Sequence, residues 1–202
     1  METIKNIVFD FGGVLMDWNP RYLYRSYFKD EEDMEYFLTH VCDNDWNREQ
    51  DRGRPFAEGI RLLVEQYPRY EEAIRLYGQR WGEMLKGEIP EGVALLRRVK
   101  AAGYRVYGLT NWSAETMPIA YERYGFLRLL DGVVVSGEEK VIKPDPRIYR
   151  ILLDRYGLKA EESVFIDDSP ANVEAARQLG FRGIVFDDAG RASAQLSALT
   201  NV

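Results

Sequence analysis

Polar and charged residues follow four short apolar runs of this sequence, at the positions where buried strands would end. The carboxyl ends of parallel strands meet at one edge of an open sheet, and such sheets bind their ligands there. We therefore expect three carboxylates, one amine and one hydroxyl to converge on a single crevice. The residues at these positions are Asp10, Thr110, Asn111, Lys143, Asp167 and Asp168.

The three carboxylates, Asp10, Asp167 and Asp168, predict a metal site. In a partly desolvated crevice they would repel one another, and at least one would take up a proton unless a cation intervened. Oxygen ligands without histidine or cysteine beside them suit Mg²⁺, which keeps some waters and binds substrate phosphate. Because Lys143 adds a positive charge, the set predicts a phosphoryl group held between Mg²⁺ and a lysine.

Each of these residues also has a structural interpretation. Thr110 and Asn111 could supply donors to an anion at the start of the next helix, or merely cap that helix. Lys143 could lie in a solvated turn, and Asp167 with Asp168 could precede a helix start. Their joint occurrence with an acid at the end of a buried strand favours a functional site.

Alternating strands and helices must position these residues. Strands that alternate with helices predict a parallel sheet covered on both faces, which is an open α/β fold. The β-branched runs that we expect as strands lie at 6–9, 104–109, 132–136, 163–166 and 183–186, and the helix-period segments between the later ones at 91–103, 146–157 and 170–180.

Residues 19–90 interrupt this alternation. They carry helix-like patterns and aromatic residues but no convincing strand, and a single crossover needs only about a dozen residues beyond its strands. We interpret residues 19–90 as a helical insertion, or cap, so that residues 1–18 and 91–202 form the core domain.

The composition limits the function classes. The 202 residues are 46% hydrophobic and 30% charged, as in ordinary globular proteins. The net charge of -6 disfavours a nucleic-acid or membrane partner. The single cysteine, Cys42, fits a reducing compartment and is expected to be buried in a helix. Without a signal-peptide pattern or an apolar run of about 20 residues, we expect a cytoplasmic protein.

Four ordered motifs resemble those of the haloacid dehalogenase superfamily: VFDFGGVL, VYGLTN, KPDPRIY and VFIDDSPANVEAARQLG, with the insertion between the first two. The resemblance implies a Rossmann-like core with helices on both faces. It also implies that Asp10 is a nucleophile that becomes an aspartyl-phosphate. Thr110 and Asn111 would bind the phosphoryl oxygens, and Lys143 would balance the charge of nucleophile and phosphate.

The same resemblance implies the ligands of a magnesium ion. Asp168 would be a direct ligand with Asp167 as its close support, and Asp10 and the backbone carbonyl of Gly12 would complete the protein ligands.

Gly12 departs from the family pattern. Most phosphatases of this superfamily carry an aspartate there as general acid and base, which glycine cannot replace. We therefore expect the rate to depend strongly on how readily the leaving oxygen departs without a proton. The departure resembles a branch of bacterial sugar-phosphate phosphatases, including one that acts on glucose 1-phosphate. Asp17 is the nearest other acid, but a hinge role suits it better.

Specificity is expected from residues 43–56, DNDWNREQDRGRPF, which resemble the substrate-facing cap segment of the family. Trp46 could stack on a sugar ring, and Arg52 could bind a second polar group. The structural alternative places Trp46 in the core of the insertion and Arg52 on a solvated helix face.

We therefore predict a magnesium-dependent phosphohydrolase for a small phosphorylated metabolite, with a sugar phosphate as the expected substrate. One alternative is a 2-haloacid dehalogenase-like hydrolase, which uses the same nucleophile without metal; the pair Asp167 and Asp168 argues against it. The other is a noncatalytic metabolite-binding protein that kept the pocket and lost turnover. The sequence makes no prediction of the oligomeric state.

Overall fold

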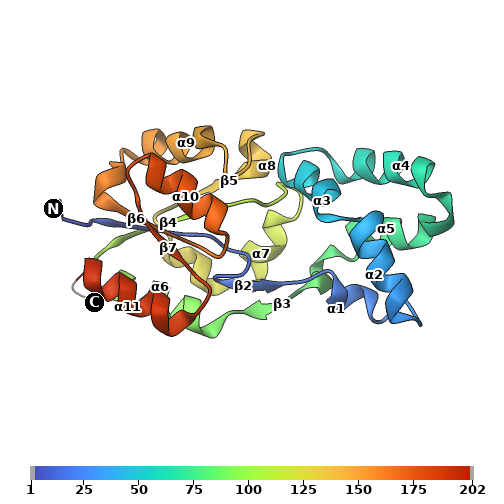
Figure 1. Ribbon diagram of the computed structural model, residues 1–202, viewed down its shortest axis with the longest axis horizontal. Helices are drawn as coiled ribbons and strands as arrows, with labels where there is room; N and C mark the ends of the chain where they lie inside the picture. The colour runs from blue at the N-terminus through green and yellow to red at the C-terminus, as the bar shows by residue number, and fades with distance from the viewer. Residues whose placement is uncertain (1–2, 201–202) are drawn as a thin grey trace.

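The computed structural model describes residues 3–200 and has a five-stranded parallel sheet at the centre of its α/β core (Figure 1). The strand order is β5-β4-β1-β6-β7, which places β1 in the middle. The first two and last two residues of the predicted core domain lie outside the described residues. The strands are β1 (Asn6–Phe9), β4 (Arg105–Thr110), β5 (Gly132–Val135), β6 (Ser163–Asp167) and β7 (Arg182–Val185).

Helices cover both faces of this sheet, so the predicted α/β fold class is confirmed (Figure 1). Successive side chains of a strand point to opposite faces. Phe9 accordingly packs in the hydrophobic cluster of one face, and Val8 in that of the other. The first cluster includes α6 (Pro90–Ala101) and α11 (Ala189–Leu199), and the second includes α9 (Pro146–Tyr156) and α10 (Pro170–Gln178).

Local sequence signals set the ends of the core helices. The Asp145 side chain accepts a hydrogen bond from the Arg147 amide at the start of α9, and Pro146 occupies the first turn. Gly157 ends the same helix at a φ of 61°. The short core elements are α7 (Met117–Arg123), η3 (Gly125–Leu129), α8 (Ser136–Glu139) and η4 (Ala160–Glu162).

The helical insertion has an aromatic core of its own. Tyr24 packs against Phe37 and Tyr77, with ring centroids 4.9 and 6.3 Å apart. Cys42 is buried as predicted, but it lies in a bend after a helix rather than within one. The elements are α1 (Arg21–Tyr24), α2 (Glu31–His40), α3 (Asn44–Asp51), α4 (Phe56–Gln66), η1 (Pro68–Tyr70), α5 (Glu71–Gln79) and η2 (Trp81–Met84).

A two-stranded antiparallel sheet carries the chain into and out of the insertion. β2 (Met16–Trp18) pairs with β3 (Leu85–Glu88), and Met16 lies opposite Glu88. The prediction that residues 19–90 contain no strand was therefore wrong. Strands of three and four residues are too short to show an alternating pattern in the sequence.

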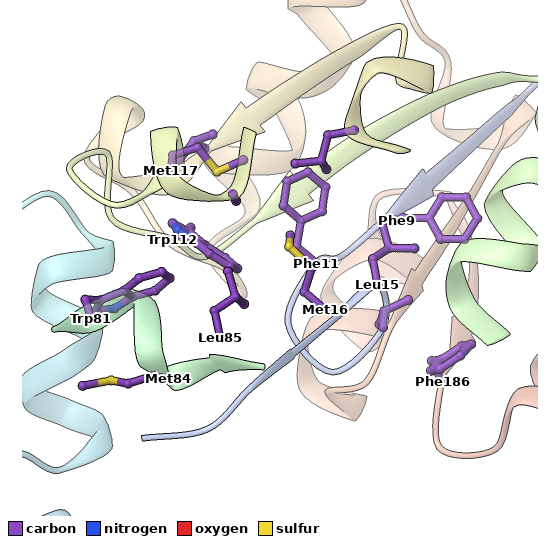
Figure 2. Close-up of a cluster of buried hydrophobic side chains, with 14 of the residues drawn as sticks. Phe9, Phe11, Leu15, Met16, Trp81, Met84, Leu85, Trp112, Met117 and Phe186 are labelled. Carbon is purple, nitrogen blue, oxygen red and sulfur yellow. The ribbon is translucent and has the colours of Figure 1, made fainter. Parts of the chain in front are cut away.

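One hydrophobic cluster continues from the sheet into the insertion. Figure 2 shows Phe9 and Phe11 on the core side and Trp81 on the insertion side, with Trp112 between them. The rings of Trp81 and Trp112 meet edge to face with centroids 5.2 Å apart. None of the helices in residues 3–200 has the length and hydrophobicity of a membrane-spanning segment.

Candidate active site

Three carboxylates meet where β1 and β6 end. One oxygen from each of Asp10, Asp167 and Asp168 lies within 4.8 Å of the others. The two strands are parallel neighbours in register, so their carboxyl ends coincide. Asp10 and Asp167 are buried, and Asp168 is exposed. The structure thus brings the three predicted metal ligands together at the edge of the sheet.

Lys143 is the cation of this cluster. Its Nζ lies 2.8 Å from Oδ1 of Asp10 and 2.7 Å from Oδ2 of Asp167, and it donates a hydrogen bond of 2.9 Å to the Leu109 carbonyl. Burial disfavours the charged amine, but the charges of Asp10 and Asp167 hold the pKa of Lys143 above its ordinary value. The site therefore contains a fixed positive charge beside Asp10.

One lysine does not balance three carboxylates. Burial and then the charge of Asp167 raise the pKa of Asp10 well above its ordinary value, against the opposing effect of Lys143. Burial and Asp167 also raise the pKa of Asp168. A set of oxygen ligands with excess negative charge is the donor set that suits a hard divalent cation such as Mg²⁺.

The loop after β1 fits closely around this cluster. Gly13 has a φ of +74°, and a Cβ at this position would lie 2.3 Å from Oδ2 of Asp168. Only glycine allows both the left-handed backbone and this close approach. Gly13 therefore lets the loop lie against Asp168. In this position the Gly12 carbonyl and the Asp168 carboxylate could hold one metal ion.

Asp167 is held by its neighbours rather than free to bind a ligand. Besides Lys143, the Ser169 amide donates to Oδ1 at 2.8 Å and Nδ2 of Asn172 donates to the same oxygen at 3.0 Å. No sequence signal marks Asn172, although its place in the first turn of α10 brings it back towards the end of β6. The contacts fit Asp167 as the support of Asp168.

Thr110 and Asn111 differ in what their side chains can do. The Thr110 hydroxyl is buried without a hydrogen-bond partner among the described residues. Asn111 instead binds the backbone of Lys143, accepting from its amide at 2.8 Å and donating to its carbonyl at 3.1 Å. No helix starts here, because residues 111–116 form a loop before α7, so the predicted helix N-terminus was wrong.

A cavity of about 120 Å³ lies between the core and the helical insertion. It opens onto Gly12 and Asn111, which belong to the loops that follow the strands of Asp10 and Thr110. The indole N–H groups of two of its tryptophans are buried without a partner among the described residues. The sequence spacing gave no signal for this set. The lining residues are Gly12, Trp18, Asn47, Asp51, Trp81, Asn111 and Trp112.

The two insertion residues predicted to bind substrate do not line this cavity. Trp46 is buried inside the insertion, where Nε1 donates to the Gly59 carbonyl at 3.2 Å and the ring meets that of Tyr77 edge to face. Arg52 is half-exposed and lies 3.7 Å from Glu49. These positions agree with the structural alternative for both residues, and their substrate contacts stay a prediction.

Asp17, the nearest acid to Gly12 in sequence apart from Asp10, is also outside the cavity lining. Its carboxylate accepts a hydrogen bond of 2.8 Å from the Tyr22 hydroxyl, beside the β2–β3 pair. This position agrees with a place at the link between core and insertion.

The parallel sheet with a carboxylate cluster at its carboxyl edge, beside a helical insertion, makes this an α/β protein with a candidate metal site. A family model of haloacid dehalogenase-like hydrolases matches residues 4–180. The chain belongs to this family.

Related proteins of this family have different activities. The chain is 28% identical over 192 residues to the sesquiterpene phosphatase AstK of Aspergillus oryzae, covering 92% of this chain and 91% of that protein. It is 28% identical to a phosphorylated carbohydrates phosphatase of Thermotoga maritima, with coverages of 90% and 84%. It is 25% identical to (S)-2-haloacid dehalogenase 1 of a Pseudomonas species, with coverages of 91% and 85%.

Solved structures agree with the fold. The magnesium complex of a haloacid dehalogenase family enzyme from Bacteroides thetaiotaomicron has a TM-score of 0.72 at 21% identity, covering 91% of this chain and 93% of that chain. The same enzyme in complex with magnesium and inorganic phosphate has a TM-score of 0.68 at 23% identity, with coverages of 93% and 96%. At these identities the likeness concerns the fold alone.

Proposed function

We propose that this protein is a magnesium-dependent phosphatase that hydrolyses a small phosphorylated metabolite through an aspartyl-phosphate on Asp10. The observation that carries the proposal is the cluster of three carboxylates with Lys143 held 2.8 Å from Asp10. Such a cluster suits a doubly charged cation and a phosphate group together. The phosphatases among the relatives support the same reaction class.

In this proposal Asp10 attacks phosphorus. Its Oδ1 accepts from the Phe11 amide at 2.7 Å and is paired with Lys143, so the carboxylate has a fixed orientation that leaves Oδ2 for the new bond. Lys143 keeps its charge because two carboxylates surround it, and it therefore attracts the anionic substrate. Asn111 positions Lys143 through two backbone hydrogen bonds.

The unpaired Thr110 hydroxyl supports a phosphoryl contact, since a phosphate oxygen would supply the partner that this buried group lacks. Asp10, Asp168 and the carbonyl of Gly12 would hold Mg²⁺. When bound, Mg²⁺ neutralises charge on the phosphoryl oxygens and lets the anion approach the acidic cluster.

The walls of the cavity favour a sugar phosphate as the substrate, as in the glucose 1-phosphate type of bacterial phosphatase. Three tryptophans, Trp18, Trp81 and Trp112, line the cavity. Indole rings stack on the apolar faces of a sugar, and the unpaired indole N–H groups of Trp18 and Trp112 can donate to its hydroxyl oxygens. A purely hydrocarbon substrate would leave these donors unpaired.

The single buried cysteine suits a cytoplasmic location.

A phosphate-release panel tests this proposal. We expect hydrolysis of sugar phosphates with Mg²⁺ and none in excess chelator, with activity restored when Mg²⁺ is added back. The panel includes 2-chloropropionate because a haloacid dehalogenase is among the relatives. Chloride release in the presence of chelator, without phosphate release, would identify a dehalogenase instead. Substrate binding without any turnover would identify a noncatalytic binding protein.

A further inference from the structure

Gly12 leaves space at the centre of the site. A Cβ built on this glycine would have no neighbour within 4 Å, and the residue lines the central cavity. Asp51, the last residue of α3, lines the same cavity from the insertion side. The cavity lining therefore includes a carboxylate from the helical insertion together with Gly12, two residues after Asp10 in the loop that follows β1.

Asp51 is fixed where the insertion meets the core. Its backbone carbonyl accepts a hydrogen bond of 2.5 Å from the Ser136 hydroxyl. Its side-chain Oδ2 accepts from Nδ2 of Asn47 at 3.1 Å, and the Ser113 backbone donates to the same carboxyl group. Contacts from both parts of the molecule thus orient this side chain, as a group that transfers protons requires.

The surroundings of Asp51 suit proton transfer near neutral pH. Burial raises the pKa of Asp51 to about 7, against the opposing effects of the Ser113 hydrogen bond and the positive charges of Arg48 and Lys143. From α5 the titratable neighbour is Tyr77, whose own pKa is raised by burial. Lys143, one of the charges that act on Asp51, also contacts Asp10 at 2.8 Å.

We propose that Asp51 is the general acid and base of this enzyme, supplied by the insertion in place of the residue missing at Gly12. The proposal rests on the proposed phosphatase function. As Asp10 bonds to phosphorus and the ester P–O bond breaks, the Asp51 carboxyl gives its proton to the departing oxygen, which leaves as an alcohol. The Asp51 carboxylate then takes a proton from the water that attacks the aspartyl-phosphate. The P–O bond to Asp10 breaks, which releases phosphate and restores both acids.

This role changes the expectation drawn from Gly12 alone. With a proton donor in the cavity, the wild-type rate should depend only weakly on the basicity of the leaving oxygen. An enzyme without the donor should lose activity on substrates with poor leaving groups and keep its activity on substrates with good ones.

Asp51→Asn tests the role with matched substrates. The experiment compares kcat/KM for 4-nitrophenyl phosphate with kcat/KM for glucose 6-phosphate and glycerol 3-phosphate. The leaving oxygen of the first needs no proton, whereas those of the other two do. Loss of a general acid should lower the alkyl phosphate values by about 10²-fold or more and the aryl value by less than about fivefold. The ratio of the two values in one preparation is independent of the folded fraction.

Two further variants and a pH profile complete the experiment. Asp51→Glu should recover part of the activity on alkyl phosphates relative to the aryl phosphate. Glu49→Gln, which removes an exposed charge from the same helix, should keep the wild-type ratio of the two kcat/KM values. The fall of kcat/KM towards alkaline pH for alkyl phosphates should disappear in Asp51→Asn. Equal losses on both substrate types, or a wild-type enzyme that hydrolyses only the aryl ester, would overturn the inference alone. A wild-type protein that releases phosphate from no ester would overturn the proposed function as well.

Discussion

The core and the helical insertion contribute different chemistry to one cavity. The core supplies fixed charges at the ends of strands, and these charges are tied to one another by contacts of 2.7 to 2.8 Å. The insertion supplies Trp81, Asn47 and Asp51 from short helices that reach the cavity only because the insertion packs on the core. In the proposed enzyme the charge that would hold phosphate is built into the sheet, whereas recognition and proton transfer would depend on packing between the core and the insertion.

The largest effect should come from the core. Asp10→Asn keeps the shape of the side chain but removes the attacking charge, so phosphate release should fall to background, by at least about 10³-fold. Circular dichroism and thermal unfolding would check that the fold survives. Asp17→Asn, in the link to the insertion, is the matched control and should keep wild-type turnover. Retention of more than a few per cent of activity by Asp10→Asn would make Asp10 a ligand only.

The dependence of activity on Mg²⁺ should also be determined by residues of the core. Because Asp168 is the exposed member of the carboxylate cluster, Asp168→Ala should raise the Mg²⁺ concentration needed for half-maximal activity by about 10-fold to 100-fold. Titration of activity with Mg²⁺ measures this shift. Asp154→Ala, an exposed acid on α9, is the control and should behave as wild type. Full activity of either protein in excess chelator would contradict a metal site.

Two tryptophans of the insertion should separate recognition from stability. Trp81→Phe weakens the edge contact with Trp112 at the cavity wall, so KM should rise about twofold to tenfold with kcat nearly unchanged. Trp46→Phe removes the hydrogen bond to Gly59 inside the insertion and should cost about 1 kcal/mol of stability without a change in KM. A higher KM for Trp46→Phe with an unchanged KM for Trp81→Phe would instead mean that Trp46, and not Trp81, contacts the substrate.

The smallest effect on activity should come from the contact between the two parts. Gly53 has a φ of +98°, and a Cβ there would lie 2.5 Å from the Lys140 side chain and 2.7 Å from the Gly137 carbonyl. Gly53→Ala should therefore lower the free energy of unfolding by about 1–3 kcal/mol and kcat by a few fold. Gly87→Ala, where a Cβ meets nothing within 4 Å, should change stability by less than about 0.5 kcal/mol. Equal stability of the two variants would mean that the contact at Gly53 does not hold the insertion.

Residues at strand ends were the predictable part of the candidate site. A buried strand that ends in an acid fixes the position of that acid, and parallel neighbours bring such ends together, so Asp10, Asp167 and Asp168 could be placed from the sequence. Asn111 was placed in the site, but its hydrogen bonds to Lys143 were not predicted because they depend on where the Lys143 backbone passes.

Residues whose place depends on packing between distant segments were not predictable. Asp51 and Trp81 enter the cavity because their helices contact the core, and no spacing in the sequence records that contact. The same limit applies to Trp46, whose indole N–H donates to the Gly59 carbonyl inside the insertion, a contact that no pattern in the sequence indicates. The link strands were missed for a simpler reason, their length of three and four residues.

The paired link strands also make the insertion an exchangeable module. Met16 and Glu88 face each other in an antiparallel pair, where opposite Cα atoms are about 4.5 to 5.5 Å apart. The chain therefore leaves and re-enters the sheet domain at neighbouring points, so a different insert that also covers the shared hydrophobic cluster could bridge them with the same strand pairing. Since Asp51 belongs to the insertion, exchanging the insertion for that of a relative would remove the proposed proton donor together with the cavity walls, while the proposed phosphate-binding edge would stay as it is.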